Sequence, residues 1–284
     1  MALRPLSRRG YAAGALALAT ALTLTACGSD SGSGTGTTSA SASAAGGVKL
    51  VQPGKLTVCT NIPYEPFQFK DASGKIVGFD VDIVDLAAKK LGVTQNIVDI
   101  DFAVIKSGAA MAAGKCDVAA AGMTITDERK QNIDFSDPYF DATQALLAKK
   151  GTGAASLADV KSKGLKLGAQ ASTTGLDYVK KQGFNPTEYA DSAKELLALQ
   201  AGQADVIVQD LPVVLTWLKK PDIAAKFEMI GSLDTGEQYG IGLKKGADPV
   251  LLKTINEEIA KAKQDGTYEK IYVKWFGKKP GELG

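Results

Sequence analysis

One short segment, residues 117–129, combines residue types that could hold a small carboxylate. It reads as an apolar strand that runs into a turn with Thr124 and Thr126 and then into the start of a helix. Unpaired backbone N–H groups at a helix N-terminus favour an anion, and the planar guanidinium of Arg129 matches a carboxylate bidentately. The alternative is a surface arginine that merely offsets Asp127 and Glu128. From this segment alone, the two interpretations stand equal.

The composition excludes several kinds of chemistry. The chain has no histidine, so catalytic sites with an imidazole base and metal sites with histidine ligands are excluded. Three cysteines cannot build a four-cysteine zinc site, and we expect neither a metal nor a cofactor. Residues 1–26 contain three arginines and no acid, so their removal leaves 30 basic and 31 acidic residues, a net charge of −1. A nearly neutral chain lacks the basic surface of a nucleic-acid-binding protein.

The N-terminus has the layout of an export signal. Arg4, Arg8 and Arg9 precede an apolar run at residues 11–26, which is short for a membrane span. The run ends in Leu-Thr-Ala-Cys27, which resembles the lipobox of bacterial lipoproteins. That resemblance implies a signal peptide at 1–26 and a lipid anchor on Cys27, which would hold the exported protein at the outer face of the bacterial cell membrane. The alternative is an ordinary secretory signal. Residues 28–47 are almost entirely Ser, Gly, Thr and Ala, which is typical of a flexible linker.

Strands and helices alternate from residue 48 onward. Strand-like runs at 56–60, 96–100, 117–121, 165–169 and 205–209 are separated by helical patterns at 81–91, 102–113, 175–181 and 193–201. Such alternation predicts α/β architecture with mainly parallel sheets. The segments 111–118 and 199–206 repeat one plan, a helix, a glycine and an Asp-Val that opens a strand. This repeat and the chain length favour two α/β lobes.

The loops after the predicted strands carry polar and aromatic side chains. Ligands of open α/β sheets bind outside the carboxyl ends of strands, so these loops should line one site. They supply one cation, one carboxylate, several hydroxyl and N–H donors and two aromatic rings, a set that complements an α-amino acid. Taken singly, Asp210 is more often a helix N-cap ahead of Pro212, and Tyr64 and Phe102 are more often core residues.

Several motifs resemble family 3 extracellular solute-binding proteins, the polar amino acid receptors of ABC importers. These are Gly-Phe-Asp-Val-Asp-Ile-Val-Asp-Leu-Ala-Ala at 78–88, Thr-Ile-Thr-Asp-Glu-Arg at 124–129, Phe-Ser-Asp-Pro-Tyr at 135–139 and Asp-Gly-Thr-Tyr at 265–268. The resemblance covers residues 50–276. It implies a two-lobed periplasmic-binding-protein-like fold of type II with two crossing hinge strands. Lobe 1 would comprise 48–140 and 241–284, and lobe 2 would comprise 141–240, with hinges near 140–143 and 236–241.

The same resemblance implies a role for individual residues. Arg129 and Thr124 would bind the ligand α-carboxylate, together with backbone N–H groups near Ser172 and Thr173. Asp210 would bind the α-ammonium, Gly122 would offer a backbone carbonyl, and the ligand side chain would lie between aromatic rings. The full expected site is Asn61, Tyr64, Phe102, Gly122, Thr124, Arg129, Ser172, Thr173 and Asp210.

The expected ligand is a polar, uncharged amino acid. Members that bind cationic side chains carry an acid where this chain has Asn61, and an amide side chain such as that of glutamine fits Asn61 better. The expected partners are a membrane permease and, through it, its ATPase, with the binding protein itself a monomer. Two alternatives are a dehydratase of small cyclic carboxylic acids on the same fold, for which no general base is marked, and a ligand sensor without a transport role.

Cys59 and Cys116 leave two alternatives open. A disulfide suits an exported protein, and lipidation of Cys27 would leave these two as a pair. Cys59, however, lies near the end of one predicted strand and Cys116 at the start of another, so parallel neighbours would hold the sulfurs apart. Two buried free thiols are the other alternative.

Overall fold

The computed structural model describes residues 47–283, which contain two five-stranded sheets. The predicted signal peptide, Cys27 and nearly all of the predicted linker lie outside these residues. The first sheet has the order β4-β1-β5-β12-β6 and the second has the order β11-β7-β10-β8-β9. The strands of the first sheet are Thr94–Asp99, Lys55–Thr60, Val118–Ala119, Gly242–Lys244 and Ile133–Phe135. Those of the second are Phe227–Tyr239, Phe140–Lys149, Val206–Asp210, Leu167–Gln170 and Thr187–Tyr189.

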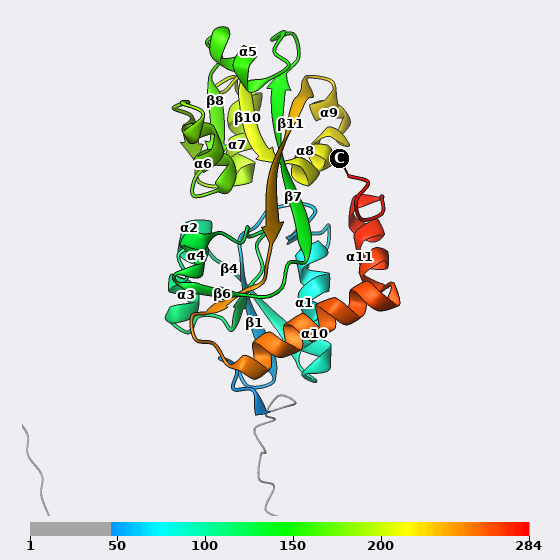
Figure 1. Cartoon of the computed structure of the whole chain (residues 1–284). Coiled ribbons are helices and arrows are strands. Elements are labelled where there is room, and N and C mark those ends of the chain that lie inside the picture. Colours follow the sequence, from blue (N-terminus) through cyan, green and yellow to red (C-terminus); the bar gives the residue numbers. More distant parts are fainter. Residues whose placement is uncertain (1–46, 284) are drawn as a thin grey trace, which may run out of the picture. The chain divides into compact units, whose positions relative to one another are not determined.

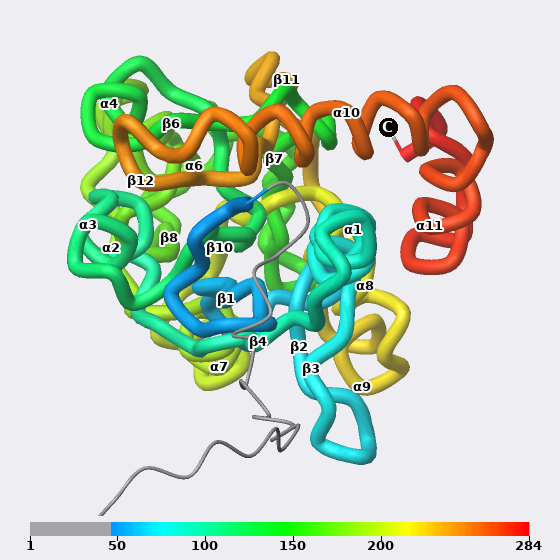
Figure 2. Tube along the Cα trace, turned by 90° about the horizontal axis from the view of Figure 1, so that it is seen from below, coloured from blue at the N-terminus to red at the C-terminus, as the bar shows by residue number. Residues whose placement is uncertain are grey.

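Helices accompany each sheet, and a small hairpin of β2 (Phe69–Lys70) and β3 (Ile76–Val77) precedes the first of them (Figure 1). Lobe 1 contains the first sheet and the helices α1 Phe79–Lys90, α2 Phe102–Lys106, α3 Ala109–Ala112, α4 Asp127–Lys130, α10 Pro249–Asp265 and α11 Thr267–Phe276. Lobe 2 contains the second sheet and the helices α5 Leu157–Ser162, α6 Thr174–Lys181, α7 Ser192–Gln200, α8 Leu211–Leu218 and α9 Pro221–Ala224. In lobe 1, α1 packs against β4, α10 and α11 (Figure 2).

Strands β7 and β11 form the two connections between the lobes. They pair antiparallel from Phe227↔Lys149 to Tyr239↔Phe140, and the pairing shifts between Leu233 and Glu237. In each sheet the pairings are mixed: β1 is parallel to β4 and β5, whereas β12 is antiparallel to β5 and β6. The two-lobed α/β fold is therefore confirmed. Its sheets are mixed because the crossing segments bring the chain back in the opposite direction.

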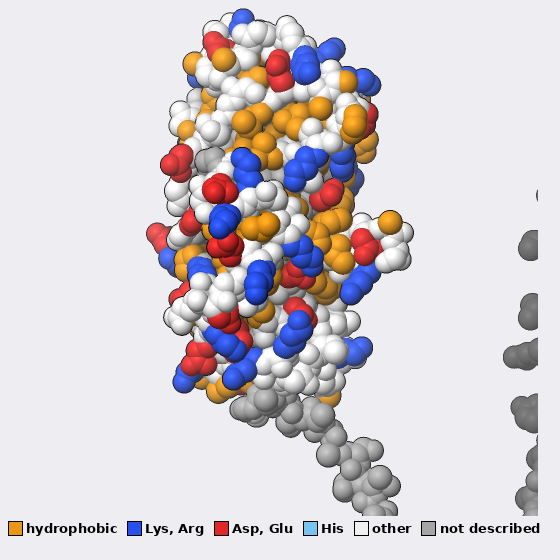
Figure 3. All heavy atoms as spheres, turned by 90° about the vertical axis from the view of Figure 1, so that its right-hand side faces the viewer, with side chains coloured by type: hydrophobic (Ala, Val, Ile, Leu, Met, Phe, Trp, Pro, Cys, Tyr) orange, Lys and Arg blue, Asp and Glu red, His pale blue; other side chains and the backbone are white. Residues whose placement is uncertain are grey.

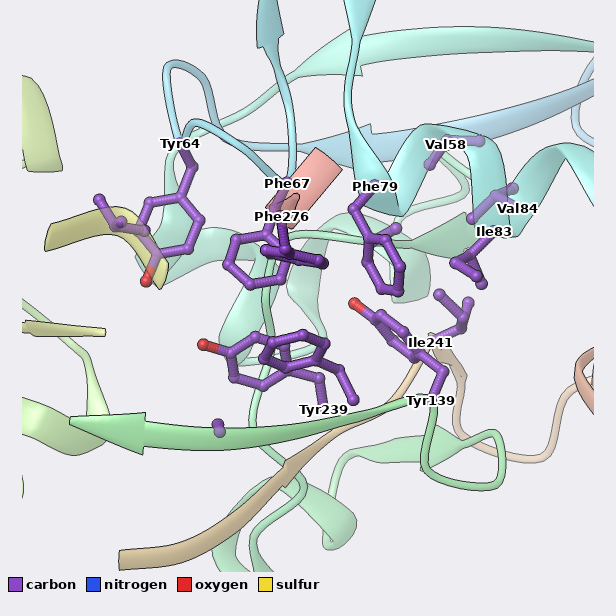
Figure 4. Packing of buried hydrophobic residues seen from close by; sticks show 14 of the residues in the cluster. Val58, Tyr64, Phe67, Phe79, Ile83, Val84, Tyr139, Tyr239, Ile241 and Phe276 are labelled. Carbon is purple, nitrogen blue, oxygen red and sulfur yellow. The ribbon is translucent and has the colours of Figure 1, made fainter. Parts of the chain in front are cut away.

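Aromatic side chains gather where lobe 1 meets the crossing strands (Figure 4). Phe79, at the start of α1, lies 5.0 Å from the ring of Phe276 at the end of α11. Phe67 lies 5.4 Å from the ring of Tyr239, the last residue of β11. Edge-to-face and offset contacts at these distances stabilise aromatic pairs. The cluster therefore joins the loop between β1 and β2, helix α11 and the end of strand β11 into one core.

Cys59 and Cys116 form a disulfide with a Cα–Cα distance of 5.6 Å. The register pairs Cys59 with Ala119, so a straight strand would place Cys116 about 10 Å from that pairing position. Strand β5 begins only at Val118, however, and the connection from α3 bends Cys116 toward β1. Of the two alternatives, the structure therefore has the disulfide, because Cys116 lies before β5 in the connection after α3 and its position is not fixed by the straight-strand spacing.

The surface that carries α8, α9 and α11 shows positive and negative side chains interspersed over its lower part (Figure 3). Hydrophobic side chains gather in its upper part. Within residues 47–283, no helix is both long and apolar enough to cross a membrane. This face has none of the single-sign charge that nucleic-acid-binding surfaces present.

Candidate functional site

A pocket between the lobes collects eight of the nine residues expected from the sequence. Lobe 1 and lobe 2 contribute opposite walls of the pocket. In each lobe most of the lining residues lie in or next to the loops that follow the strands. The lining residues are Asn61, Tyr64, Gln68, Phe102, Ala121, Gly122, Thr124, Arg129, Gln170, Thr173, Thr174 and Asp210. Ser172 is the expected residue that does not line the pocket, although its carbonyl oxygen accepts a hydrogen bond from Arg129 Nη2 at 3.3 Å.

Arg129 is a buried cation, only 5% exposed. Its Nη1 donates to the carbonyl oxygen of Thr124 at 2.8 Å, and the guanidinium carbon lies 5.5 Å from the centre of the Phe102 ring. Burial lowers the pKa of Arg129, while Asp177 and Glu237 act in the opposite direction. An arginine keeps its charge in proteins. The side chain is thus a fixed positive charge with remaining N–H donors, held by backbone acceptors and an aromatic face rather than by a bound acid.

Arg129 lies in a helix that is only four residues long, Asp127–Lys130. Helix α4 has a single turn, and the Thr126 hydroxyl caps it by accepting from the Arg129 backbone N–H at 3.1 Å. The expected cluster of free N–H groups at this helix start is therefore reduced, and the side chain of Arg129 is the main donor. Helix α6 opens the opposite wall. There the Thr173 hydroxyl accepts from Leu176 N at 3.2 Å and donates to the Gln170 carbonyl at 2.8 Å.

Asp210 is buried in the opposite lobe at the end of β10, 6% exposed. It stands at the N-cap position of α8, yet its side chain makes no capping hydrogen bond. Its carboxylate instead accepts from the hydroxyls of Tyr64 and Tyr239 and from Gln144 Nε2. Burial raises the pKa of Asp210 to about 6, against the lowering effect of these donors. Asp210 thus has the N-cap position expected from the sequence, but its carboxylate faces polar donors between the lobes instead of capping the helix.

A buried carboxylate holds the turn after β5. Asp80, in the first turn of α1, is 1% exposed and accepts from Gly122 N at 2.8 Å and from the Tyr139 hydroxyl at 2.7 Å. Gly122 has φ of +53°, and a Cβ at this position would lie 2.8 Å from Tyr64 Cε1. Only glycine fits this close approach without strain. The turn places Gly122 and Thr124 beside Tyr64, in the wall formed by lobe 1.

The residues that sequence reasoning missed are mostly amides and a hinge tyrosine. Gln68, Gln170 and Thr174 line the pocket, and Gln144 and Tyr239 contact Asp210. Gln170 is the first residue of the loop at 170–175, which is rich in hydroxyl side chains. It could have been included for that reason. Gln144 and Tyr239 lie on the crossing strands, where no sequence pattern marks which side chains turn toward a ligand.

The space between the lining side chains is small, about 20 Å³, which corresponds to about one water molecule. The hydroxyls of Tyr64 and Tyr239 lie at the Asp210 carboxylate, where a ligand ammonium would compete with them. Among the described residues no group of three or more potential metal ligands occurs. The pocket thus has a buried cation, Arg129, on the wall of one lobe and a buried carboxylate, Asp210, on the wall of the other.

Comparison with known proteins assigns this fold and site to a class. Residues 56–278 match the model of the bacterial extracellular solute-binding proteins, family 3, and the chain belongs to this family. The chain is 34% identical over 240 residues to the probable histidine-binding protein of Neisseria gonorrhoeae, with 81% of this chain and 86% of the relative covered. It is 35% identical over 214 residues to the ABC transporter glutamine-binding protein GlnH of Bacillus subtilis, with 74% and 77% covered.

Among solved structures, an ancestral arginine-binding protein bound to glutamine superposes with a TM-score of 0.73 at 42% identity. The match covers 80% of this chain and all of that one. The protein is thus an exported, substrate-binding component of an ABC importer for an α-amino acid, and it is not an enzyme. The dehydratase alternative is set aside because these relatives are binding proteins.

Proposed function

We propose that the pocket binds the α-amino acid as a zwitterion clamped between the lobes, with Arg129 on the carboxylate and Asp210 on the ammonium. The observation that carries this proposal is the pair of buried, opposite charges, 5% and 6% exposed, on opposite walls of one pocket. Thr124 and the backbone near Ser172 and Thr173 assist Arg129, and the Gly122 carbonyl assists Asp210. Each charge-assisted hydrogen bond contributes about 1.5–3 kcal/mol, so a few of them reach micromolar affinity, about −8 kcal/mol.

The ligand side chain lies beside Tyr64 and Phe102 and ends in an uncharged polar group. Support comes from the lining residues beyond the charged pair, which include the amides Asn61, Gln68 and Gln170 and no second carboxylate. A cationic side chain would lack a counterion there. Further support is an ancestral arginine-binding protein, 42% identical, whose structure has glutamine bound; a second such structure, 43% identical, has arginine bound, so the choice between the two rests on the lining residues. The ligand of the present protein is accordingly a polar, uncharged amino acid such as glutamine.

Replacement of Arg129 tests the site. Arg129→Ala removes the cation, and we expect amino acid affinity to fall at least about 100-fold, which corresponds to the loss of two charge-assisted bonds. Arg129→Lys keeps the charge but loses the fork, and should bind with intermediate affinity. Isothermal titration calorimetry on the soluble body measures both variants.

The matched control is Lys130→Ala, because Lys130 is an exposed neighbour that pairs with Asp127 at 3.3 Å. Its affinity should equal that of the wild type. Circular dichroism of each variant establishes that the fold is retained. A folded Arg129→Ala protein with unchanged affinity would sink the assignment of the carboxylate site.

The export signal and Cys27 lead to a second proposal, a monomer anchored by lipid to the outer face of the cell membrane. Its support is the lipobox-like Leu-Thr-Ala-Cys27 followed by a linker of Ser, Gly, Thr and Ala. In a bacterial host, Cys27→Ala should shift the protein from the membrane fraction to the medium. An unchanged membrane fraction would contradict the anchor.

A further inference from the structure

A buried carboxyl behind the pocket has no role in the zwitterion clamp. Glu195, on α7 of lobe 2, has no exposed surface. Its Oε2 accepts from Gln209 Nε2 at 2.8 Å, whereas Oε1 has no hydrogen-bond partner in the described part of the chain. Burial raises the pKa of this carboxyl well above its usual range. A glutamate is rarely buried unless its carboxyl is hydrogen-bonded or paired. The residue that Glu195 contacts, Gln209, therefore indicates what the buried carboxyl does.

The contacts of Gln209 fix the orientation of its side-chain amide. Nε2 donates to Glu195 Oε2, and Oε1 accepts from the Asp210 backbone N–H at 2.9 Å. The Tyr64 hydroxyl also lies 2.9 Å from Oε1. The backbone N–H of Asp210 can only donate, so an oxygen must lie at that end of the Gln209 amide. The contact of Nε2 with Glu195 Oε2 adds to this orientation.

Gln209 transmits this orientation to the pocket wall. Its Nε2 also lies 3.4 Å from Oε1 of Gln170, a long hydrogen bond that occupies the oxygen of that amide. Gln170 lines the pocket, and its Nε2 remains the donor available to a ligand. On the wall of lobe 1, Asn61 Nδ2 donates to the Ile100 carbonyl at 3.1 Å, which leaves Asn61 Oδ1 as an acceptor.

We propose that Glu195 and Gln209 are positioning residues that fix Gln170 as a donor opposite the acceptor Asn61, so that the pocket selects a side chain ending in a primary carboxamide. The carboxamide carbonyl accepts from Gln170 and its amino group donates to Asn61. A carboxylate would face the Asn61 oxygen without a proton, and a guanidinium would face the Gln170 amino group without an acceptor. Each mismatch leaves a desolvated polar group unpaired. The inference rests on the proposed function of this pocket.

The test compares the affinities of glutamine, glutamate and arginine by calorimetry. The wild type should bind glutamine at least about tenfold more tightly than either competitor. Glu195→Met removes the acceptor at similar volume, so the Gln209 amide keeps the Asp210 N–H but loses the partner that holds its Nε2 end toward Gln170. The preference for glutamine over arginine should then fall by about tenfold. Glu195→Gln keeps an acceptor oxygen for Gln209 and should restore the wild-type preference.

Two further variants keep the outcome decisive. Gln170→Met should abolish the preference directly, and it stands in if Glu195→Met does not fold. Glu188→Gln is the control, because this half-exposed acid of lobe 2 pairs only with Lys180 in the described structure, at 2.5 Å. A wild type that binds no amino acid would refute the proposed function. If the wild type binds an amino acid but Glu195→Met and Gln170→Met leave the ratio of glutamine to arginine affinity unchanged, only this inference would be refuted.

Discussion

At the scale of residues, the two charges of the pocket are held by different means. Arg129 contacts the carbonyls of Thr124 and Ser172 and the ring of Phe102, and within residues 47–283 no carboxylate forms a salt bridge with it. Asp210 is surrounded by hydroxyl and amide donors, which a ligand ammonium must replace. Binding of the ligand ammonium should therefore depend on pH more strongly than binding of the ligand carboxylate.

Affinity should depend on pH through Asp210. Its pKa is raised to about 6, and a bound ammonium favours the ionised carboxylate. Below that pH the ligand must displace a proton, so affinity should fall toward acid, by up to about tenfold per pH unit. The ionisable groups that act on Asp210 include Tyr64, Tyr239, Glu195, Glu237 and, from the facing wall, Arg129. Of these, the tyrosines and Glu195 are buried, with raised pKa values.

Calorimetry from pH 5 to 8 measures this dependence, and buffers of different ionisation enthalpy report the proton released. Asp80→Asn is the necessary control, because burial also raises the pKa of Asp80 to about 6. That variant keeps one acceptor oxygen toward Gly122 and should retain the slope. A dissociation constant that stays level down to pH 5 would contradict the displacement of a proton from Asp210 when the ammonium binds.

At the scale of elements, the turn that follows β5 links the pocket to the rest of lobe 1. Asp80 from α1 holds Gly122, and the same carboxylate reaches Tyr139 next to β7. The turn is thereby tied both to the helix of lobe 1 and to the start of a crossing strand. A change in the turn should alter the site before it alters the fold.

Gly122→Ala should abolish binding with a moderate loss of stability. The new Cβ would meet Tyr64 at 2.8 Å, and the positive φ would cost about 1–3 kcal/mol. Gly114→Ala is matched to it: φ is +66° there, but no atom lies within 4 Å of the added Cβ. The temperature of thermal unfolding should fall in both variants, whereas only Gly122→Ala should lose affinity for the amino acid. Equal affinities in the two variants would contradict the contact with Tyr64.

The sequence predicted elements better than it predicted their ends and contacts. The helix expected at 81–91 is α1, Phe79–Lys90, because its apolar spacing matches one buried face. The helix expected at 102–113 is broken at Gly108, where φ is +78° and a Cβ would lie 2.8 Å from Asn132 O. That break depends on a contact with a distant segment, which local periodicity cannot report. For the same reason the pattern identified the loops of the site but not Tyr239 or Gln144.

At the scale of the molecule, several contacts join the lobes directly. Besides the bond from Arg129 to the Ser172 carbonyl, the Ser192 hydroxyl donates to the Pro63 carbonyl at 2.7 Å, and Lys220 pairs with Glu65 at 3.1 Å. Both of the latter contacts involve the loop that carries Tyr64. An exposed ion pair contributes little, so the partly buried hydrogen bond of Ser192 is the stronger of the two. These contacts favour the state in which the lobes touch, and a ligand adds to them.

Ser192→Ala should weaken binding by destabilising that state. The loss of one hydrogen bond of about 0.5–1.5 kcal/mol predicts a dissociation constant about 2–10-fold higher. The effect should fall mainly on the dissociation rate, which stopped-flow fluorescence measures. Ser162→Ala removes a bond within lobe 2, to the Asp159 carbonyl at 3.2 Å, and should leave the rate unchanged. Equal dissociation rates in both variants would show that the bond to Pro63 does not hold the lobes together.

The disulfide between Cys59 and Cys116 has a practical consequence for measuring such motion. It uses both cysteines of residues 47–283. A single cysteine introduced on the surface of this body would therefore offer a thiol that reagents can modify selectively without reduction. A fluorophore attached on the Glu65 side of the interface would sense the departure of Lys220 as the lobes separate. The protein is in this respect a ready scaffold for an optical amino acid sensor.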